Sequence, residues 1–396
     1  MPRIGFESWT ASTGVIDGKP HVVFGGCNYL GLAHHPGVHH AVTQGLARWG
    51  LTTTASRETT GNTKAHESLE REIAAFMGMP AAILTTEGYT ANIALGQGLA
   101  ADHSIAVLDE KSHSSVVLGM TASGLKVEYY RHLDAAHAIE VAHRHAGGHS
   151  DSKGVVVMTD GVFAADGGVA PAGAILAGLP AKGVTFVLDD CHGFTVLGEK
   201  GRGLIERDRL AADPRVVLTT TFAKGLGCYG GAIVGRRALI DTIMQRSLVY
   251  RGTTPCPPPV VEGAREALRI IDREPERLAQ LRDNVRHMRR LLAHTINWRP
   301  PEPMDALVPI FVFWLDPASE MHRVQKALSD AGFFVPLIDY PGGPTPWYFR
   351  ATVTAGHTAE QIERFGEALR AAVAPAGAGT QVSNPRVAQA TTATSH

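Results

Sequence analysis

Two long apolar runs end next to residues that can carry chemistry, and they constrain the fold more than any other feature of the chain. The first run starts at Val184 and reaches Asp189 and His192; the second, Val216 to Thr221, is followed by Lys224. Both are rich in β-branched residues and continuously hydrophobic, as are strands buried on both faces of a parallel sheet. In open α/β sheets, ligands bind beyond the carboxyl ends of the strands. The sequence therefore predicts a carboxylate, an imidazole and an amine at one edge of one sheet.

A lysine with an upstream aspartate is the pair that pyridoxal phosphate (PLP) requires. The amine forms a Schiff base with the cofactor, and the carboxylate binds the nitrogen of its ring. By itself, an Asp at a strand end is usually a helix cap or turn residue, and a lone Lys is usually a solvated surface charge. Lys224, however, stands between Thr-rich strand residues and a glycine run, where no long solvated helix face is available to it.

Composition limits the classes of partner. The net charge of −1 and the lack of a long basic cluster argue against nucleic acid or an anionic membrane as partners. No apolar run approaches the roughly 20 residues of a membrane span. The cysteines are widely spaced with no CxxC pattern, and no metal site is predicted. With no apolar signal segment at the start, we expect a reducing, cytoplasmic location. The cysteines are Cys27, Cys191, Cys228 and Cys256.

The order of the elements predicts an α/β protein with an appended smaller domain. Residues 1–35 are expected to form an irregular N-terminal segment with a short β-like stretch at His21–Phe24. Residues 36–259 alternate strands with helices, which indicates one doubly wound, mostly parallel sheet flanked by helices. Prolines then break the chain before a long charged helix, so residues 260–375 are expected to form a smaller C-terminal α+β domain. Residues 376–396 have the composition of a disordered tail.

Two further segments follow predicted strands and contain possible cofactor contacts. Gly88 and Tyr89 stand where a strand gives way to a helix, and backbone N–H groups at a helix N-terminus bind phosphate. An ordinary βα turn explains this pattern equally well. His113 could stack on a planar cofactor or merely lie beside a helix cap. The Gly225–Gly230 segment matches a dinucleotide fingerprint in form, but a strand follows it where that fingerprint requires a helix, so we reject a nucleotide role.

These pieces together resemble the α-oxoamine synthase family of fold type I PLP-dependent enzymes. The similarity extends from Asn28–Leu32 to His357–Thr358, nearly the whole chain up to the expected tail. The matching segments occur in the order of the family, which makes the resemblance specific. They are Ser56-Arg57 with His66 and Leu69-Glu70, Gly88-Tyr89 with Asn92, His113 with Ser115, His132-Leu-Asp134, Asp166-Gly167 with Pro171, Asp189 with His192, Gly198 with Gly201-Arg-Gly203, Thr221 with Lys224, and Arg350.

The resemblance implies a role for each catalytic position. Lys224 corresponds to the Schiff-base lysine, which also removes the Cα proton of the amino-acid substrate. Asp189 would keep the pyridine nitrogen protonated, and His192 would bind the phenolic oxygen of the cofactor. His113 would stack on the ring and orient the substrate carboxylate.

The resemblance also implies contacts to the phosphate and to the substrate. Gly88, Tyr89 and Thr221 would hold the cofactor phosphate. Thr253 and Thr254 match positions that reach the phosphate from a partner subunit, which implies a homodimer with shared sites. For the substrate, Arg350 would bind the amino-acid carboxylate, since Arg is its natural bidentate partner, although a structural salt bridge is the ordinary role of such a residue. Asn28 is a further candidate for substrate binding.

The implied reaction is the condensation of a small amino acid with an acyl thioester, carried by CoA or by an acyl-carrier protein, with loss of CO₂ to give an α-amino ketone. Some positions depart from the family pattern: Glu87 replaces a Ser, Ala164 replaces a cofactor-facing Ser, Asp190-Cys191 replaces Glu-Ala, and Tyr348 replaces an Arg. Glu87 and Ala164 motivate one alternative, another PLP reaction on the same fold such as aminotransfer, aldol cleavage or a different carbon–carbon bond formation. The resemblance offers a second, a cofactor-free partner subunit, because some family heterodimers carry one inactive chain. Retention of Lys224, Asp189 and His192 argues against an inactive chain.

Overall fold

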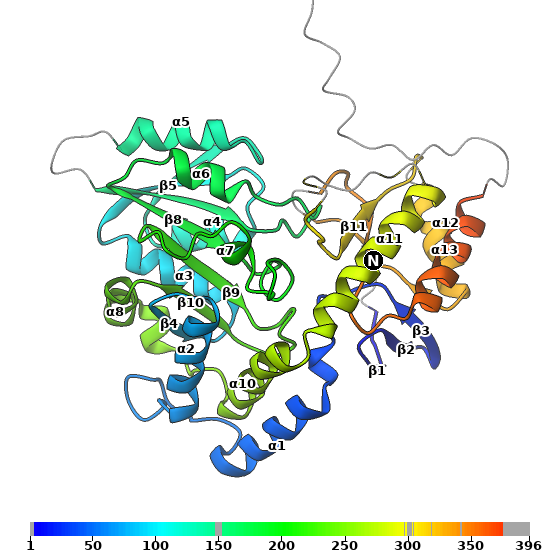
Figure 1. Ribbon diagram of the computed structural model, residues 1–396, viewed down its shortest axis with the longest axis horizontal. Coiled ribbons are helices and arrows are strands. Elements are labelled where there is room, and N and C mark those ends of the chain that lie inside the picture. Colours follow the sequence, from blue (N-terminus) through cyan, green and yellow to red (C-terminus); the bar gives the residue numbers. More distant parts are fainter. Residues whose placement is uncertain are drawn as a thin grey trace, which may run out of the picture. The chain divides into compact units, whose positions relative to one another are not determined.

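The computed structural model describes residues 4–146, 153–296, 298, 303, 305–317, 319–340 and 343–374. The chain divides into two compact units. The large unit comprises Cys27–Ala164 and Gly168–Leu278. The small unit comprises Met1–Gly26, Ala165–Gly167 and Ala279–His396. Figure 1 shows the elements of both units. In the described part of the chain, no helix is long and apolar enough to cross a membrane.

A seven-stranded sheet in the order β4-β10-β9-β8-β7-β5-β6 forms the centre of the large unit. The five strands from β9 to β6 run parallel, and β10 is antiparallel to both of its neighbours. This arrangement confirms the predicted α/β fold with a mostly parallel sheet. The strands are β4 Ala81–Thr85, β5 His103–Asp109, β6 Lys126–Tyr130, β7 Gly154–Asp160, β8 Val184–Asp189, β9 Val216–Thr221 and β10 Gly231–Gly235.

Both faces of this sheet are buried, as the continuous hydrophobicity of β8 and β9 requires. Alternate residues of the strands, among them Val156 and Met158, pack with α3, α4 and α8 in one apolar cluster. The intervening residues, such as Val155 and Val157, are buried as well. The helices of this unit are η1 Leu32–His34, α1 Pro36–Trp49, α2 Lys64–Phe76, α3 Gly88–Leu99, α4 Ser114–Ala122, α5 Ala135–Ala146, α6 Ala172–Gly178, α7 Leu204–Arg207, α8 Arg237–Arg246, α9 Leu248–Gly252 and α10 Pro258–Arg273.

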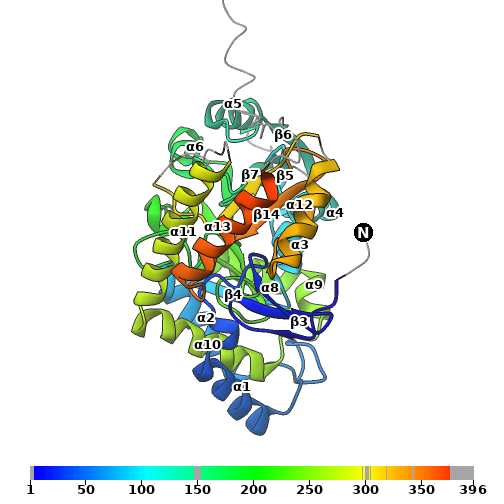
Figure 2. The same cartoon turned by 90° about the vertical axis from the view of Figure 1, so that its right-hand side faces the viewer.

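The described residues of the small unit form two short sheets and two helices, and α11 continues into this unit from the large one. One sheet has the order β1-β2-β3-β12 and the other β11-β14-β13. Helices α11 and α13 lie side by side (Figure 2). Their approach is close at Gly366, where a Cβ would overlap the side chain of Leu291. The elements are β1 Ser8–Trp9, β2 Thr13–Ile16, β3 Lys19–Val23, α11 Glu276–Thr295, β11 Ile310–Phe313, α12 Ser319–Asp330, β12 Phe333–Phe334, β13 Leu337–Ile338, β14 Tyr348–Thr352 and α13 Ala359–Val373.

The N-terminal segment is more regular than the sequence predicted. Asp17 and Gly18, with φ of 49° and 68°, form the two-residue turn between β2 and β3, where Ile16 pairs with Lys19. A two-residue turn with both φ values positive matches the right-handed twist of a hairpin, and Asp-Gly is a preferred sequence for it. The Asp-Gly signal was therefore present in the sequence, but the strands around it are too short to show a clear alternation.

The division into units differs from the expected domains at both ends. Residues 1–26 join the small unit, because β3 pairs in parallel with β12. Helix α10 stays in the large unit, where it packs on α1 and α2; Arg265 of α10 forms an ion pair with Glu72 of α2. Neither the pairing of β3 with β12 nor the packing of α10 on α2 has a local signal in the sequence. The expected tail, residues 376–396, lies outside the described residues.

Candidate active site

The polar residues predicted at the strand ends lie in the large unit, at the end of β8 and on the loops that follow β8 and β9. Asp189 is the last residue of β8, and Lys224 follows β9 by three residues. The turn after Lys224 is tight: the N–H of Gly227 donates to the carbonyl of Lys224 at 2.9 Å. A Cβ on Gly225 would overlap the hydroxyl of Thr195, so glycine is required directly after the lysine.

Asp189 is a buried carboxylate held in place by hydrogen bonds. It is 4% exposed. The side chain of Asn92 donates to Oδ2 at 2.7 Å, and the N–H of Cys191 donates to Oδ1 at 3.2 Å. Hydrogen bonds to the charged form of a buried carboxylate favour that form. Asp189 is therefore suited to bind a cationic N–H group, such as a protonated pyridine nitrogen.

His113 is connected to Asp189 through two buried side chains. Asn92 also donates to Oγ of Ser115 at 2.9 Å, and this hydroxyl lies 2.7 Å from Nδ1 of His113. The N–H of Ser115 donates to the same Nδ1 at 3.2 Å, so Nδ1 is an acceptor and the ring is neutral. Burial lowers the pKa of His113, the charge of Lys224 lowers it further, and that of Asp189 opposes the shift. A neutral, fixed imidazole can stack on a planar cofactor.

His192 is fixed by a residue from the start of the large unit. The hydroxyl of Tyr29 lies 2.7 Å from Nδ1 of His192, and both side chains are buried. If the hydroxyl donates to Nδ1, then Nε2 carries the proton and can donate to another group. This arrangement leaves His192 able to bind an oxygen atom such as the phenolic oxygen of PLP.

Gly88 opens α3 next to Thr221, the last residue of β9. A Cβ on Gly88 would lie 2.8 Å from Cβ of Thr221 and 3.4 Å from Sγ of Cys191, so a side chain would fill this space. The N–H groups of a helix N-terminus favour an anion. The side chain of Glu87 accepts one of them, the N–H of Thr90. Tyr89 is 37% exposed, and its ring meets that of His113 edge-on at a centroid distance of 6.1 Å.

These residues fit PLP. The buried carboxylate of Asp189 matches the pyridine nitrogen, and the partly exposed amine of Lys224 matches the aldehyde. The space kept open by Gly88 at a helix N-terminus matches the phosphate. The donor set is thus complementary to each polar part of the cofactor.

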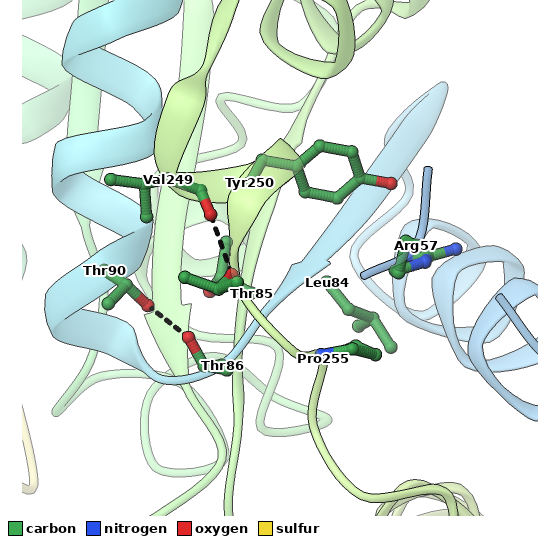
Figure 3. A pocket seen from close by; sticks show the side chains of 9 residues that line it. Arg57, Leu84, Thr85, Thr86, Thr90, Val249, Tyr250 and Pro255 are labelled. Atoms are coloured by element: carbon green, nitrogen blue, oxygen red, sulfur yellow. Dashed lines mark hydrogen bonds between the residues drawn. The ribbon is translucent and has the colours of Figure 1, made fainter. Parts of the chain in front are cut away.

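Thr253 and Thr254 lie at the end of α9. Thr253 donates to the carbonyl of Val249 at 2.7 Å, and Thr254 is exposed. Thr253 lines a small open pocket that also reaches the loop before α3 (Figure 3). Neither Asp189 nor Lys224 lines this pocket, so it is separate from the polar cluster on the strand ends. Its lining residues are Arg57, Leu84, Thr85, Thr86, Thr90, Val249, Tyr250, Thr253 and Pro255.

The two predicted substrate contacts have different settings. Asn28 hydrogen-bonds within its own turn: Oδ1 accepts from the N–H of Ala33 at 3.2 Å, and Nδ2 lies 3.3 Å from Nδ1 of His34. Arg350 belongs to β14 in the small unit and pairs with Val312 of β11. Tyr348, two residues earlier on the same strand, is fully buried, and burial raises the pKa of its hydroxyl to about 12.

The structure also shows how the departures near Asp189 are accommodated. Asp190 is completely buried and accepts the N–H of Leu204 at 2.7 Å. A Cβ on Gly193 or Gly203 would overlap its carboxylate, so glycines make room for it. Burial raises the pKa of Asp190 to about 7 and that of the Cys191 thiol well above its usual range. A raised pKa disfavours the thiolate, which is the nucleophilic form of cysteine.

Several residues that hold the site together were not predicted to do so. Asn92 and Ser115 belong to segments that match the family. Asn92, however, bonds Asp189 across 97 residues and Ser115 across 23, and a linear pattern does not show such contacts. Tyr29 also lay in a matching segment, at a separation of 163 residues from His192. Asp160, at the end of β7, accepts the N–H of His113 at 3.0 Å. A polar residue at the end of a buried strand was a signal that could have found Asp160.

Comparison with known proteins agrees with this geometry. The family model for aminotransferase class I and II matches residues 19–369. An 8-amino-7-oxononanoate synthase of Methylococcus capsulatus is 37% identical over 365 residues, covering 91% of each chain. The chain belongs to the aminotransferase class I and II family, and within it to the α-oxoamine synthases.

Solved structures of α-oxoamine synthases share the fold. A serine palmitoyltransferase of S. paucimobilis, solved with PLP and myriocin, has a TM-score of 0.85 at 25% identity and covers 93% of this chain and 92% of its own. An 8-amino-7-oxononanoate synthase of Francisella tularensis has a TM-score of 0.74 at 24% identity, covering 89% and 97%. The fold type I assignment is confirmed. The chain is a PLP-dependent enzyme that condenses an amino acid with an acyl thioester.

Proposed function

We propose that this α-oxoamine synthase joins a small amino acid to an acyl thioester with loss of CO₂, and that Lys224 moves the Cα proton. The observation that supports this most is that Asp189 ends β8, Lys224 follows the adjacent strand β9, and hydrogen bonds through Asn92 and Ser115 connect Asp189 to His113. An amine near an imidazole and a carboxylate can both hold a cofactor and accept a proton.

Each residue has a proposed task in this reaction. PLP, when bound, withdraws electrons from the Cα of the amino acid. Asp189 keeps the proton on the ring nitrogen, and Nε2 of His192 donates to the phenolic oxygen. Nζ of Lys224 accepts the Cα proton. His113 orients the substrate carboxylate from the face on which it stacks.

Further proposed contacts bind the phosphate of the cofactor and the carboxylate of the amino acid. Gly88, Tyr89 and Thr221 bind the phosphate at the start of α3. Arg350 binds the carboxylate of the amino acid, and Asn28 is proposed to line the substrate site. The departures Glu87 and Ala164 alter the surroundings of the cofactor without removing any of these groups.

The product name of the relatives suggests the first substrates to test. In 8-amino-7-oxononanoate the amino group is on the carbon next to the terminal methyl group. A decarboxylating condensation that gives this product consumes alanine and a seven-carbon acyl thioester with a terminal carboxylate. We propose this pair as the first candidate and a long-chain acyl thioester with serine as its competitor, since serine palmitoyltransferases share the fold.

The test is a release assay on the PLP-loaded protein with a panel of amino acids and acyl thioesters. We expect one pair to release free thiol and CO₂ in equal amounts, and a ketone product to appear by mass spectrometry. No thiol release with any pair, although the cofactor is bound, would contradict the proposal. Formation of pyridoxamine phosphate from an amino acid alone would indicate aminotransfer instead.

We also propose a homodimer in which Thr253 and Thr254 reach the cofactor phosphate of the partner subunit. The segment before them carries an exposed apolar surface, with Leu248 71% exposed and Met244 39% exposed, and such residues are typical of interfaces. A cytoplasmic location is proposed as well. It is supported by four free cysteines, which fit a reducing compartment.

A further inference from the structure

Two carboxylates stand side by side at the ends of neighbouring strands in the large unit. Asp160 ends β7 and Asp189 ends β8, and the two residues are paired partners across these parallel strands. Paired residues of a sheet direct their side chains to the same face. Asp160 is 5% exposed and Asp189 is 4% exposed. Asp189 has a proposed contact to the cofactor, whereas Asp160 has none.

The hydrogen bonds distinguish the two carboxylates. Asp189 accepts from the side chain of Asn92 and from the N–H of Cys191, which stabilise a negative charge. Asp160 accepts the backbone N–H of His113 at 3.0 Å. That bond fixes the residue that precedes α4, because His113 is the N-cap of this helix. Asp160 therefore holds the backbone of the residue whose ring is expected to stack on PLP.

Charges around Asp160 disfavour its ionisation. The carboxylates of Asp189 on β8 and Asp109 on β5 disfavour it, whereas the N–H of His113 and the charge of Lys224 after β9 oppose them. Tyr130 of β6 is also near. Asp109 is fully buried and accepts three hydrogen bonds, from His132 and from the N–H groups of Lys111 and Leu133. Two carboxylates that share one buried site cannot both ionise without a large cost. Burial first, and then the charge of Asp189, raise the pKa of Asp160 well above its usual range.

We propose that Asp160 is a positioning residue that carries a proton at neutral pH, so that Asp189 is the single anion of the pair. A neutral acid still accepts the N–H of His113, but it adds no negative charge near Asp189 and the imidazole. If Asp160 were ionised, its negative charge would raise the proton affinity of Asp189 and of the imidazole of His113. The inference rests on the proposed function only in that Asp189 faces the cofactor nitrogen.

The direct test is an infrared difference spectrum of the PLP-loaded protein at neutral pH, wild type minus Asp160→Asn, without substrates. We expect the carbonyl band of a protonated carboxyl group. Carboxylate bands in its place would overturn the proposal. Asp213→Asn is the matched control, because Asp213 pairs with Arg215, which lowers the pKa of its carboxyl, and should give carboxylate bands.

Cofactor binding gives a second readout. Asp160→Asn keeps a neutral acceptor for His113, so the dissociation constant for PLP should stay within about twofold and the pH profile of the visible absorbance should not move. Asp160→Ala removes the acceptor of a buried N–H and should weaken binding by about tenfold. If Asp160→Asn weakens binding as much as Asp160→Ala, the proposal is wrong.

If Asp160→Ala does not fold, the infrared spectrum and the PLP affinity of Asp160→Asn still test the proposal. Neither measurement depends on turnover, so failure of the release assay leaves both interpretable.

Discussion

Single side chains of the site depend on their neighbours for their protonation and orientation. Ser115 and Asn92 connect the imidazole of His113 to the carboxylate of Asp189, at distances between 2.7 and 2.9 Å. In a buried network each bond fixes the direction of the next, so the tautomer of His113 and the rotamer of Asp189 are set together. The residues expected to contact PLP are therefore ordered by other protein groups.

Lys224→Ala should abolish turnover and the covalent attachment of PLP while leaving the fold intact. The amine is the group that bonds the cofactor, and Lys224 is only partly buried, so its truncation leaves no large cavity. Borohydride reduction followed by peptide mapping measures the attachment site. Lys182→Ala, at an exposed position, is the control. If Lys224→Ala still traps the cofactor, another lysine is the attachment residue.

Arg350→Lys should weaken the affinity for the amino acid by about 1–3 kcal/mol and leave cofactor affinity nearly unchanged. Lysine keeps the charge but loses the planar fork that binds both carboxylate oxygens. Spectral titration of the PLP-loaded protein with amino acid measures both affinities. Arg323→Lys, on the exposed side of α12, serves as the control. If both affinities fall together, or neither falls, Arg350 is structural.

Whole elements, rather than single groups, shape the phosphate side of the site. Helix α3 begins at Gly88 close to the end of β9, and Gly231 of β10 approaches the backbone of Glu87 and Gly88, where a Cβ would lie 2.7 Å from the N of Gly88. The start of α3 is thus held against two adjacent strands. Glycines at both contact points allow this close approach, while the side chains of Glu87 and Thr90 cap the helix start.

Gly88→Ala should raise the dissociation constant for PLP by about tenfold or more, because its Cβ would lie 2.8 Å from Cβ of Thr221 and displace the helix start. Equilibrium binding followed by visible absorbance measures the effect. Gly173→Ala is the control, since its Cβ would make ordinary contacts with Asp208, 3.6 Å away, on a helix of the same unit. Equal affinity of the Gly88 variant and the wild type would show that the phosphate lies elsewhere.

His357 joins its own turn to β3 in the small unit and should make the stability of this unit depend on pH. Its ring accepts the N–H of Thr354 at 3.0 Å and lies 3.2 Å from the carbonyl of Val23. Burial lowers the pKa of His357 from 6.5 to about 4. The unfolded chain thus binds a proton below pH 6.5 that the folded state does not bind until about pH 4. Stability should be full above this window and fall by roughly 3 kcal/mol as the pH drops through it.

Denaturant unfolding of the wild type and His357→Gln at several pH values measures this contribution. We expect the difference in unfolding free energy between the two proteins to shrink as the pH falls from 6.5 to about 4. Other histidines titrate in both proteins and cancel in the difference. A difference that stays constant with pH would mean that the ring is not held neutral.

At the scale of the whole molecule, the proposed homodimer makes each active site depend on two chains. Mixing Lys224→Ala with Thr254→Glu tests this directly. In the mixed dimer, one site combines an intact Lys224 with an intact Thr254 from the partner, and the other site carries both changes. We expect activity to return after subunit exchange, measured by thiol release. If each subunit used its own Thr254, no intact site would form and the mixture would stay inactive.

The main features of the large unit could be predicted from the sequence because they follow from local patterns. Continuous apolar runs in β8 and β9 indicate strands buried on both faces, and the carboxyl ends of parallel strands meet at one edge of the sheet. Asp189, His192 and Lys224 were therefore expected near one another. The positions of the strand ends can be located from the sequence, because each apolar run stops at a polar residue.

What only the tertiary structure decided is which distant residues become neighbours. The pairing of β3 with β12 places residues 1–26 in the small unit, the pairing of β7 with β8 puts Asp160 beside Asp189, and Tyr29 meets His192 across 163 residues. Such contacts depend on the order of strands in a sheet and on the packing of every layer at once. No local period encodes that order, because each strand would be equally buried beside a different neighbour.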